Sequence, residues 1–434
     1  TTDWVPGRYG SSLLFDGSDD YVRVSDTSDT NPGTADFTIS SWMKYDVSKA
    51  RSDAGGIFGK RNGTGDQYVV YLNTDDTLCY YVDDTTPTNA GCSVSTIDDN
   101  GWHHVVFVFD RDVGVSYYID GIKSSDVDSL SSVTGSIDPV SFVEIASGNA
   151  SVTGSGFKKF DGQLDEVRYY NYARTPAQIA WEYNRGGPIG WWKLDECSGT
   201  VAHDASGFAN DGTITIGGTG DNTSAGTCTG ASGQAWFAGA TGKRNASLDF
   251  DGTDDYVDMS SSVATFEGLN EGTISGWFKT SNTAFMPLFS ISDKDATSDV
   301  VYISLGNTTG SYSDESMAFI VHRTNITVLA MYVRHGETYY ADNVWHHFAI
   351  TTGDGNNRIM IDGVLQEITY NVGSASTNEF SNIDNADTMR IGNRDNSGID
   401  YYHDGLIDEL KIYNYALTEE QARVDYNYGT VRFN

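Results

Sequence analysis

The sequence predicts an all-β protein that folds as two tandem β-sandwiches, each ending in a short α-helix. Two observations lead to this prediction. Strand-like alternation of apolar and polar residues dominates the chain, and one ordered series of motifs occurs in it twice. A duplication with such a long period indicates two copies of one domain, each with its own core, and excludes a solenoid of short repeats.

The closing run of each copy is the clearest part of the duplication. It reads FDGQLDEVRYYNYARTPAQI at 160–179 and HDGLIDELKIYNYALTEEQA at 403–422. Earlier pieces recur in the same order: LLFDGSDDYV with LDFDGTDDYV, FTISSW with GTISGW, GWHHVVF with VWHHFAI, and YYIDG with IMIDG. We therefore expect two domains, at 1–186 and 187–434. The first is expected to lack the opening strand and polar loop that the second has.

Single segments agree with this architecture. In HHVVFVFD, at 103–110, both alternate faces are apolar, so this strand is expected to lie between two layers. Thr175 with Gln178, and Thr418 with Gln421, form capping boxes that predict a helix at the end of each copy. Many strands followed by one terminal helix favour a β-sandwich over an alternating α/β fold.

Charge and hydropathy limit the partners. The net charge of −33 disfavours nucleic acid as a ligand, because the phosphate backbone would be repelled. No run of 18 apolar residues occurs, so no membrane insertion is expected. The chain opens TTDWVPGRYG without a secretory leader, which is expected of a mature or trimmed N-terminus.

The cysteines form two local pairs. Cys79 and Cys92 flank a hairpin-like stretch of the first copy, and Cys197 and Cys228 flank a Gly/Thr/Ser-rich stretch before the second. An even number in local pairs predicts two disulfides and an oxidising compartment. Four reduced, buried thiols are the alternative. A zinc site is disfavoured because no CxxC or nearby His accompanies them.

These strings resemble the laminin-G-like, concanavalin A-like jelly-roll family. GWWKLDECSGTVAHDASGFANDGT, at 190–213, is similar to that family's opening, and the FDGxDDYV, WHH, IDG and IDEVRIYN-like strings are similar to its later strands. The resemblance covers nearly the whole chain. It implies two concanavalin A-like jelly-roll sandwiches of antiparallel sheets, with roles in carbohydrate or protein binding within extracellular proteins.

The resemblance also implies a structural calcium, expected above all in the second domain. Relatives often combine an Asp of the LDE tripeptide with a DxSGxxN loop, and the corresponding residues here are Asp408 with Asp204, Ser206 and Asn210. The first domain has Asp165 but no such loop, so calcium is less expected there. Alternatively, these residues cap backbone N–H groups at strand ends and in Asx turns.

Other groups weighed for chemistry favour binding over catalysis. The acidic FDG turns could hold metal, but turn formation explains their aspartates as well. The paired histidines could also bind metal, but adjacent strand residues point to opposite faces, so one histidine of each pair is expected to pack in the core. The groups are Asp16, Asp19, Asp20, Asp251, Asp254, Asp255, His103, His104, His346 and His347. No Glu-x-Asp-x-x-Glu strand of related glucanases is present, and so we expect no enzyme.

Adjacent tyrosines offer a possible sugar-binding surface, since one of each pair could face outward and stack on a ring. The pairs are Tyr80 with Tyr81, Tyr117 with Tyr118, Tyr339 with Tyr340, and Tyr401 with Tyr402. Alternatively, the inward rings fill the core and the outward rings only cover the sheet.

Two functions are therefore expected as alternatives. The first is a non-catalytic adhesion or carbohydrate/protein-binding module, extracellular or at the cell surface, whose partner is a glycan or a surface protein. The second is a structural subunit of an extracellular filament or surface assembly, in which copies of the chain are joined by strand donation to the incomplete first domain. The tail YNYGTVRFN, at 426–434, is a candidate donor.

Overall fold

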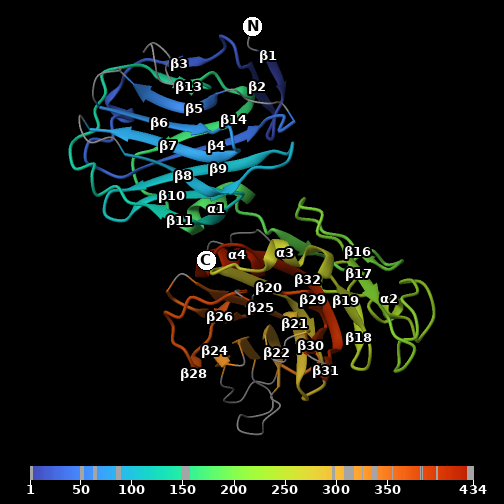
Figure 1. The fold of residues 1–434 in the computed structure, drawn as a ribbon. Coiled ribbons are helices and arrows are strands. Elements are labelled where there is room, and N and C mark those ends of the chain that lie inside the picture. Colours follow the sequence, from blue (N-terminus) through green and yellow to red (C-terminus); the bar gives the residue numbers. More distant parts are fainter. Residues whose placement is uncertain are drawn as a thin grey trace. The chain divides into compact units, whose positions relative to one another are not determined.

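A computed structural model of the chain describes residues 3–427, apart from 49–52, 62–65, 85–88, 148–156, 296–298, 307–316, 325, 334–339, 354, 382, 384 and 397–398. The tail candidate therefore lies largely outside the described residues. The chain divides into two compact units, Thr1–Arg185 (unit 1) and Gly186–Asn434 (unit 2). Both are built mainly of antiparallel sheets (Figure 1), so the all-β prediction is confirmed.

Unit 1 contains two sheets. The first has the order β1-β2-β14-β4-β9-β10-β11, and the second has the order β3-β12-β5-β6-β7-β8, with β13 added to β5. The first sheet comprises β1 (Asp3–Pro6), β2 (Ser11–Asp16), β14 (Asp161–Tyr170), β4 (Phe37–Lys44), β9 (His103–Asp110), β10 (Gly114–Ile119) and β11 (Ile122–Asp128). The second comprises β3 (Val22–Val24), β12 (Val143–Ile145), β5 (Ala54–Arg61), β6 (Gln67–Leu72), β7 (Thr77–Asp83), β8 (Asn89–Thr96) and β13 (Phe157–Lys158). A short 3-10 helix, η1 (Ser28–Thr30), follows β3.

The core of unit 1 lies between these two sheets. Phe37, Phe107 and Phe109 from the first sheet join Tyr68 and Tyr80 from the second in one buried cluster. Phe37 and Phe109 stack with ring centroids 4.2 Å apart. Aromatic residues that alternate along facing strands thus interdigitate, and this packing makes the unit a β-sandwich.

Helix α1 (Pro176–Asn184) covers the outer face of the first sheet of unit 1. Its predicted capping box is formed: the Thr175 hydroxyl accepts from Gln178 N, and the Gln178 side chain accepts from Thr175 N. Ile179 of α1 packs against Val106 and Val108 of β9, whereas the alternate residues of β9 enter the core. The prediction that β9 lies between two layers is confirmed.

Unit 2 repeats this plan with a larger second sheet. The first sheet has the order β15-β32-β20-β25-β26-β27, with β18 added to β32, and the second has the order β16-β17-β19-β29-β21-β22-β23-β24-β28. The first sheet comprises β15 (Gly190–Trp192), β32 (Asp404–Tyr413), β20 (Gly272–Lys279), β25 (His346–Thr352), β26 (Arg358–Ile361), β27 (Val364–Leu365) and β18 (Leu248–Asp251). The second comprises β16 (Val201–Ala202), β17 (Gly212–Thr215), β19 (Tyr256–Asp258), β29 (Thr388–Ile391), β21 (Met286–Asp293), β22 (Asp299–Leu305), β23 (Met317–Arg323), β24 (Ile326–Val333) and β28 (Ile368–Val372).

Helices and a hairpin complete unit 2. They are β30 (Asn393–Asn396), β31 (Ile399–Tyr402), α2 (Ala235–Ala238), η2 (Ser260–Ser262), α3 (Val263–Phe266) and α4 (Glu419–Tyr426). The predicted capping box of Thr418 and Gln421 is formed at the start of α4. Ala422 of α4 packs against Ala349 and Met360, so the terminal helix covers the sheet of β25 and β26 as α1 covers its own sheet.

Both predicted disulfides are present. Cys79 on β7 is bonded to Cys92 on β8, and Cys197 is bonded to Cys228. The first bond joins residues that are paired across two neighbouring strands. The second closes the segment that precedes the repeated strands of unit 2. The alternative of four reduced thiols is wrong.

The prediction of outward tyrosines is wrong for one pair. Tyr117 and Tyr118 are both buried, at 0% and 3% exposure. Tyr117 enters the sandwich core, and Tyr118 lies in the cluster under Ile179 of α1. The terminal helix thus covers the face that a lone sheet would have left to solvent. Tyr339 lies outside the described residues.

Candidate functional site

A cavity of about 370 Å³ opens at one end of the first sheet of unit 1. We call it the Lys44 cavity. It is lined by Leu14 of β2, Lys44 at the end of β4, Tyr45, Asp46 and Asn100 in the loops, and Asp161, Gly162 and Gln163 at the start of β14. Its volume lies in the range of about 300–1,000 Å³ that is typical of small-ligand sites.

Strand register brings three of these residues together. Gln163 of β14 is paired with Leu14 on one side and with Lys44 on the other. Gly162 adopts φ +152°, and a Cβ at this position would lie 2.5 Å from the Lys44 carbonyl oxygen. Only glycine therefore lets β14 approach β4 so closely, which explains the second residue of the Asp-Gly pair that opens β14.

The cavity presents polar groups with free hydrogen-bonding capacity beside one apolar wall. Within the described residues, the Lys44 ammonium has no hydrogen bond or ion pair. The Gln163 side-chain oxygen accepts from the Ser12 hydroxyl at 3.2 Å, and the Asn100 side-chain oxygen accepts from Val47 N at 3.0 Å. The side-chain NH2 group of each residue can therefore still donate to a ligand. The Leu14 side chain is 38% exposed. Such a lining suits a ligand with many hydroxyl groups.

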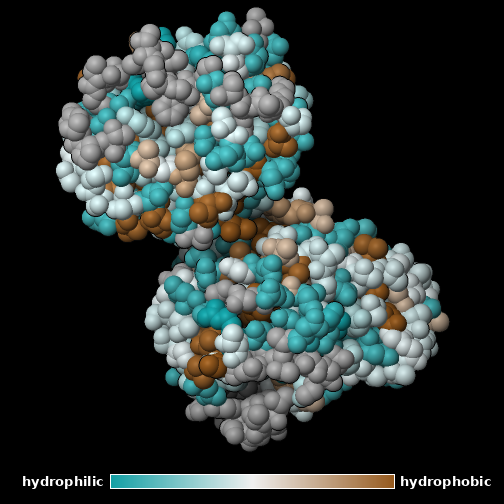
Figure 2. All heavy atoms as spheres, viewed as in Figure 1, coloured by the Kyte–Doolittle hydropathy of each residue, from teal (hydrophilic) through white to brown (hydrophobic). Residues whose placement is uncertain are grey.

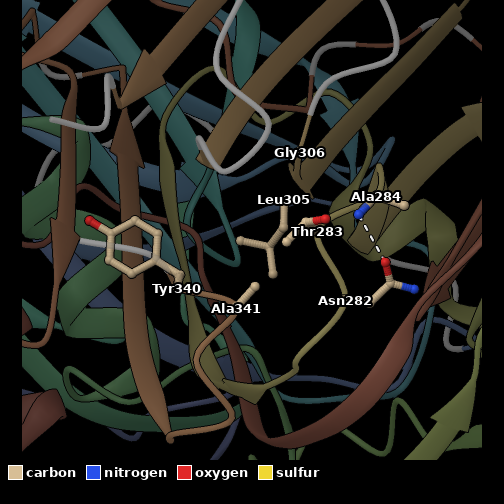
Figure 3. Close-up of a pocket in the computed structure, with 7 residues that line it drawn as sticks. All are labelled: Asn282, Thr283, Ala284, Leu305, Gly306, Tyr340 and Ala341. Carbon is tan, nitrogen blue, oxygen red and sulfur yellow. Dashed lines mark hydrogen bonds between the residues drawn. The ribbon is translucent and has the colours of Figure 1, made fainter. Parts of the chain in front are cut away.

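One pocket in the described part of unit 2 is too small for a ligand. A pocket of about 10 Å³ is lined by Asn282, Thr283, Ala284, Leu305, Gly306, Tyr340 and Ala341 (Figure 3). Asn282 Oδ1 accepts from Ala284 N at 2.9 Å, and Asn282 Nδ2 donates to Asp404 Oδ2 at 2.7 Å. Asp404 matches Asp161, which lines the Lys44 cavity in unit 1. About 10 Å³ holds one water at most.

The acidic FDG turns each bring three carboxylates close together. Among the described residues, Asp16, Asp19 and Asp20 in unit 1, and Asp251, Asp254 and Asp255 in unit 2, each place three carboxylate oxygens within 4.8 Å of one another. Asp161 of the Lys44 cavity is the register partner of Asp16. The acidic turn of unit 1 therefore adjoins the cavity.

The turn in unit 2 is wrapped by a loop that unit 1 lacks. Asn222 donates from its backbone to Asp251 and from its side chain to Asp249 and Asp255. Burial raises the pKa of Asp249 to about 6, and the charges of Asp404 and Asp251 add to the shift. Burial likewise raises the pKa of Asp255 to about 6. A cation would relieve this crowding of negative charge.

The residues predicted for calcium lie in two hydrogen-bond networks. Asp204 accepts from Trp191 N, from Ser206 N and Oγ, and from Asn210 N, all at 2.7–2.9 Å. Its carboxylate thus shapes the DxSGxxN loop, as the capping alternative expects. Asp408 accepts from Arg244 N at 2.8 Å, and in unit 1 Asp165 accepts from Tyr9 N at 2.9 Å. The calcium assignment itself stays a prediction.

Asp408 differs from Asp165 in one respect that bears on calcium. It is 0% exposed, and its second oxygen, Oδ1, is buried without a hydrogen-bond partner among the described residues. Burial, followed by the charge of Glu409, raises the pKa of Asp408 to about 8 despite the bond from Arg244 N. An orphaned carboxylate oxygen at this depth fits a bound cation, because a hard cation would supply the missing partner.

The paired histidines point to opposite faces, as expected. His103 contacts Asp120 at 2.8 Å and Asp99 at 3.1 Å, and His346 contacts Asp362 and Asp342 at the same two distances. The second member of each pair is buried beneath the terminal helix: His104 lies 3.6 Å from Glu182, and His347 lies 3.3 Å from Asp425. The two histidines of a pair therefore have separate partners and share no site.

The cavity residues were not identified from the sequence, although a signal existed. Leu14 and Gln163 stand at positions where the repeated motifs differ, since unit 2 has Asp249 and Leu406 there. Lys44, by contrast, is matched by Lys279 and gives no such signal. Positions that diverge inside otherwise repeated strings were the available clue.

Comparisons with known proteins address the family. A family model described as the concanavalin A-like lectin/glucanases superfamily (Laminin_G_3) matches residues 16–180 and 251–423. No curated protein sequence matches the chain. No helix in the described part of the chain is long and apolar enough to cross a membrane.

Solved structures similar to the chain include mouse laminin alpha1 chain domains LG4-5, with 12% identity, TM-score 0.32 and coverage of 96% of this chain and 94% of that one. The CBM40 of the Ruminococcus gnavus IT-sialidase has 16% identity, TM-score 0.35 and coverage of 42% and 96%. Domain 4 of AbnA, an extracellular arabinanase from Geobacillus stearothermophilus, has 19% identity, TM-score 0.32 and coverage of 41% and 79%. These low scores carry no functional weight. The family model, which matches well over half of the residues, shows that the chain belongs to the concanavalin A-like lectin/glucanase superfamily.

Proposed function

We propose that the chain is a non-catalytic extracellular binding module that takes a saccharide in the Lys44 cavity of unit 1. The observation that carries this proposal is the cavity itself, which has the volume of a ligand site and is lined by Lys44, whose ammonium has no partner among the described residues. A sugar offers many hydroxyl groups and one apolar ring face. The hydroxyls would bond to Lys44, Gln163 and Asn100, and the ring face would lie on Leu14.

The surface and the disulfides support an extracellular role. The face seen in Figure 2 consists mostly of hydrophilic and intermediate residues, as expected for a protein exposed to water. Both disulfides need an oxidising compartment to form and persist. The non-catalytic part of the proposal is supported by the sequence, which contains no Glu-x-Asp-x-x-Glu run like that of related glucanases.

A structural calcium is part of the proposal for unit 2. Asp408 would anchor the ion through its orphaned oxygen, and Asp204, Ser206 and Asn210 are the further ligands that the sequence predicts. Calcium takes six to eight oxygen ligands and would fix the opening loop to β32. The acidic turn of Asp16, Asp19 and Asp20 is a second candidate place, beside the sugar site.

A glycan array followed by titration calorimetry tests the sugar site. The array should hold neutral and carboxylate-bearing oligosaccharides, and the best ligand is then titrated into wild type and Lys44→Ala. We expect Lys44→Ala to weaken binding about tenfold or more, because a hydrogen bond to a charged group contributes about 1.5–3 kcal/mol.

The matched control is Lys279→Ala. Lys279 ends β20 as Lys44 ends β4, but it does not line the pocket of about 10 Å³ described in unit 2. This variant should bind as wild type does. Equal affinities of wild type and Lys44→Ala, or equal losses in the two variants, would contradict the proposal, as would an array without any bound glycan.

A second candidate function is a subunit of an extracellular assembly. It is favoured by one observation: among the described residues of unit 1, part of one edge of β14 is paired with no other strand.

A further inference from the structure

Strand β14 of unit 1 is paired along only part of one edge. On the β2 side, Asp161, Gly162, Gln163 and Leu164 are paired with residues of β2. On the other side, β4 is paired with β14 from Gln163 to Tyr170. Among the described residues, no strand is paired with the Val167–Tyr170 part of β14 on the β2 side. We call this part the β14 edge.

In unit 2 the same edge carries a strand. Gly190, Trp191 and Trp192 of β15 are paired with Ile412, Lys411 and Leu410 of β32. Trp191 N donates to Asp204 and thus points away from β32. Ile189 N, just before β15, donates to the Ile412 carbonyl oxygen at 2.8 Å. Since successive N–H groups of a strand alternate in direction, Trp192 N is turned towards Leu410 of β32. Leu410 and Ile412, which match Val167 and Tyr169, therefore direct their peptide groups to β15.

Exposure differs between the two edges as a missing strand would predict. Leu410, Ile412 and Tyr413 are buried, whereas the matching Val167, Tyr169 and Tyr170 are only half-buried. Tyr415 is 3% exposed and the matching Tyr172 is 43% exposed. The β14 edge thus offers peptide groups and apolar surface together. Such an edge is prone to pair with another chain.

Unit 1 also retains the two residues that hold the indole of Trp191 in unit 2. There, Trp191 Nε1 donates to Glu409 Oε2 at 2.7 Å, and Lys411 Nζ lies 5.1 Å from the Trp191 ring centroid. The matching residues of unit 1 are Glu166 and Arg168, which are ion-paired with each other. Their side chains are 28% and 40% exposed. An acceptor and a cation for an indole ring are therefore present next to an edge that lacks the tryptophan.

We propose that the β14 edge binds an extended segment of another polypeptide, in antiparallel register, with a Gly-Trp-Trp pattern like that of Gly190–Trp192. The incoming segment donates backbone N–H groups to Val167 and Tyr169, and its middle tryptophan reaches Glu166 and Arg168. This mode is β-strand addition, in which backbone bonds give affinity and side-chain contacts give specificity. It rests on the second candidate function, assembly by strand donation, and is independent of the Lys44 cavity.

The test uses the whole chain and a synthetic peptide with the sequence of residues 187–196, GPIGWWKLDE. Fluorescence anisotropy of the labelled peptide gives the affinity, and hydrogen–deuterium exchange locates the site. We expect segment 165–172 to exchange faster than segment 408–415 in the free protein, and to become protected when the peptide binds. Protection at another segment, no binding at millimolar peptide, or a free 165–172 segment as protected as 408–415 would overturn the proposal.

Backbone methylation of the peptide provides a control that needs no variant to fold. Methylation of the nitrogen of Ile189 or Trp192 should weaken binding about tenfold, because in unit 2 Ile189 N donates to β32 and Trp192 N is turned towards it. Methylation of Trp191 should have little effect, because this nitrogen points away in the register of unit 2. Equal effects of the three methylations would contradict antiparallel strand addition in this register.

Glu166→Ala tests the choice of tryptophan. The variant should weaken the parent peptide but bind a Trp191→Phe peptide as wild type does, because phenylalanine has no N–H to donate. An equal loss with both peptides would overturn the assigned indole contact. Protection of 165–172 that rises with protein concentration, without peptide, would overturn the assignment to another polypeptide and identify a second copy as the occupant.

Discussion

Lys411 Nζ lies 2.5 Å from Asp425 Oδ1, so an almost wholly buried ion pair joins β32 to helix α4. Ser275 and His347 also contact the Asp425 carboxylate, at 2.6 and 3.3 Å. Unit 1 repeats the arrangement with Glu182 of α1, which accepts from Ser40 at 2.8 Å and from Arg168 at 2.7 Å. A buried acid with several partners thus fixes the terminal helix of each sandwich.

Replacing Asp425 with Asn should destabilise unit 2 by about 3–5 kcal/mol, because the buried Lys411 ammonium would lose its counter-charge. Equilibrium denaturation, read by hydrogen–deuterium exchange in α4, gives the unfolding free energy of that unit. Glu419→Gln is the control on the same helix, since Glu419 pairs with Arg423 at an exposed i,i+4 position. It should cost less than about 0.5 kcal/mol, and equal losses would contradict the prediction.

Glu182 should make unit 1 sensitive to acid. Burial raises the pKa of Glu182, but His104, Ser40 and Arg174 outweigh burial and bring the pKa down to about 2. A depressed pKa stabilises the fold above the unfolded value of about 4.3 and ceases to do so as pH falls towards 2. The unfolding free energy of wild type should therefore exceed that of Glu182→Gln at pH 6.

The two free energies should converge between about pH 4.3 and pH 2, over the range in which Glu182 is protonated. Asp112→Asn, at an exposed carboxylate of the same unit, should follow wild type throughout. A difference between wild type and Glu182→Gln that stays constant down to pH 2 would show that the glutamate acts through packing and not through its charge.

Gly162→Ala should destabilise unit 1 and remove sugar binding together. The new Cβ would lie 2.5 Å from the Lys44 carbonyl oxygen, at a φ of +152° that other residues rarely adopt. We expect a loss of about 1–3 kcal/mol from this strain, measured by denaturation. Gly10→Ala is the control, because Gly10 also has positive φ but its Cβ would meet nothing within 4 Å. It should retain the sugar affinity of wild type.

Local signals in the sequence predicted local structure well. The capping boxes of Thr175 and Thr418, the two disulfides and the position of strand 103–110 depend on residues that are near one another in the chain or on simple alternation. The Lys44 cavity depends on register among three strands, since Leu14, Gln163 and Lys44 are far apart in sequence. Register at this precision is set by long-range packing, which single-sequence patterns do not specify.

Tyr118 illustrates a second limit. Alternation identified it correctly as the residue on the opposite face from Tyr117, but it could not show that α1 covers that face. Asp204 illustrates a third limit, because the same DxSGxxN string suits a calcium ligand set and a loop held by four hydrogen bonds to one carboxylate. In such cases the residue type shows which interactions a side chain can make, and its neighbours in the folded structure determine which of them it makes.

Asp408→Asn should have opposite effects with and without calcium. Burial raises the pKa of Asp408 to about 8, well above the unfolded value of about 3.9. At pH 7, folding must therefore either bury a poorly compensated charge on Asp408 or take up a proton. The unfolding free energy of unit 2 consequently falls as pH rises from about 4 to 8. In chelator, the neutral Asn should raise the unfolding free energy of unit 2 by at least about 1 kcal/mol at pH 7.

Calcium should stabilise wild-type unit 2 in proportion to RT ln(1 + [Ca²⁺]/Kd), and Asp408→Asn should lose this gain because the anchoring oxygen would carry no charge. Thermal unfolding with calcium and with chelator measures both effects, and elemental analysis counts the ions. Asp165→Asn is the matched control: Asp165 is not among the residues with an orphaned buried oxygen, so this change should leave the calcium response of unit 2 intact. If Asp408→Asn kept the calcium-dependent gain, the ion would have to bind elsewhere, and the acidic turn of Asp251, Asp254 and Asp255 would be the next site to change.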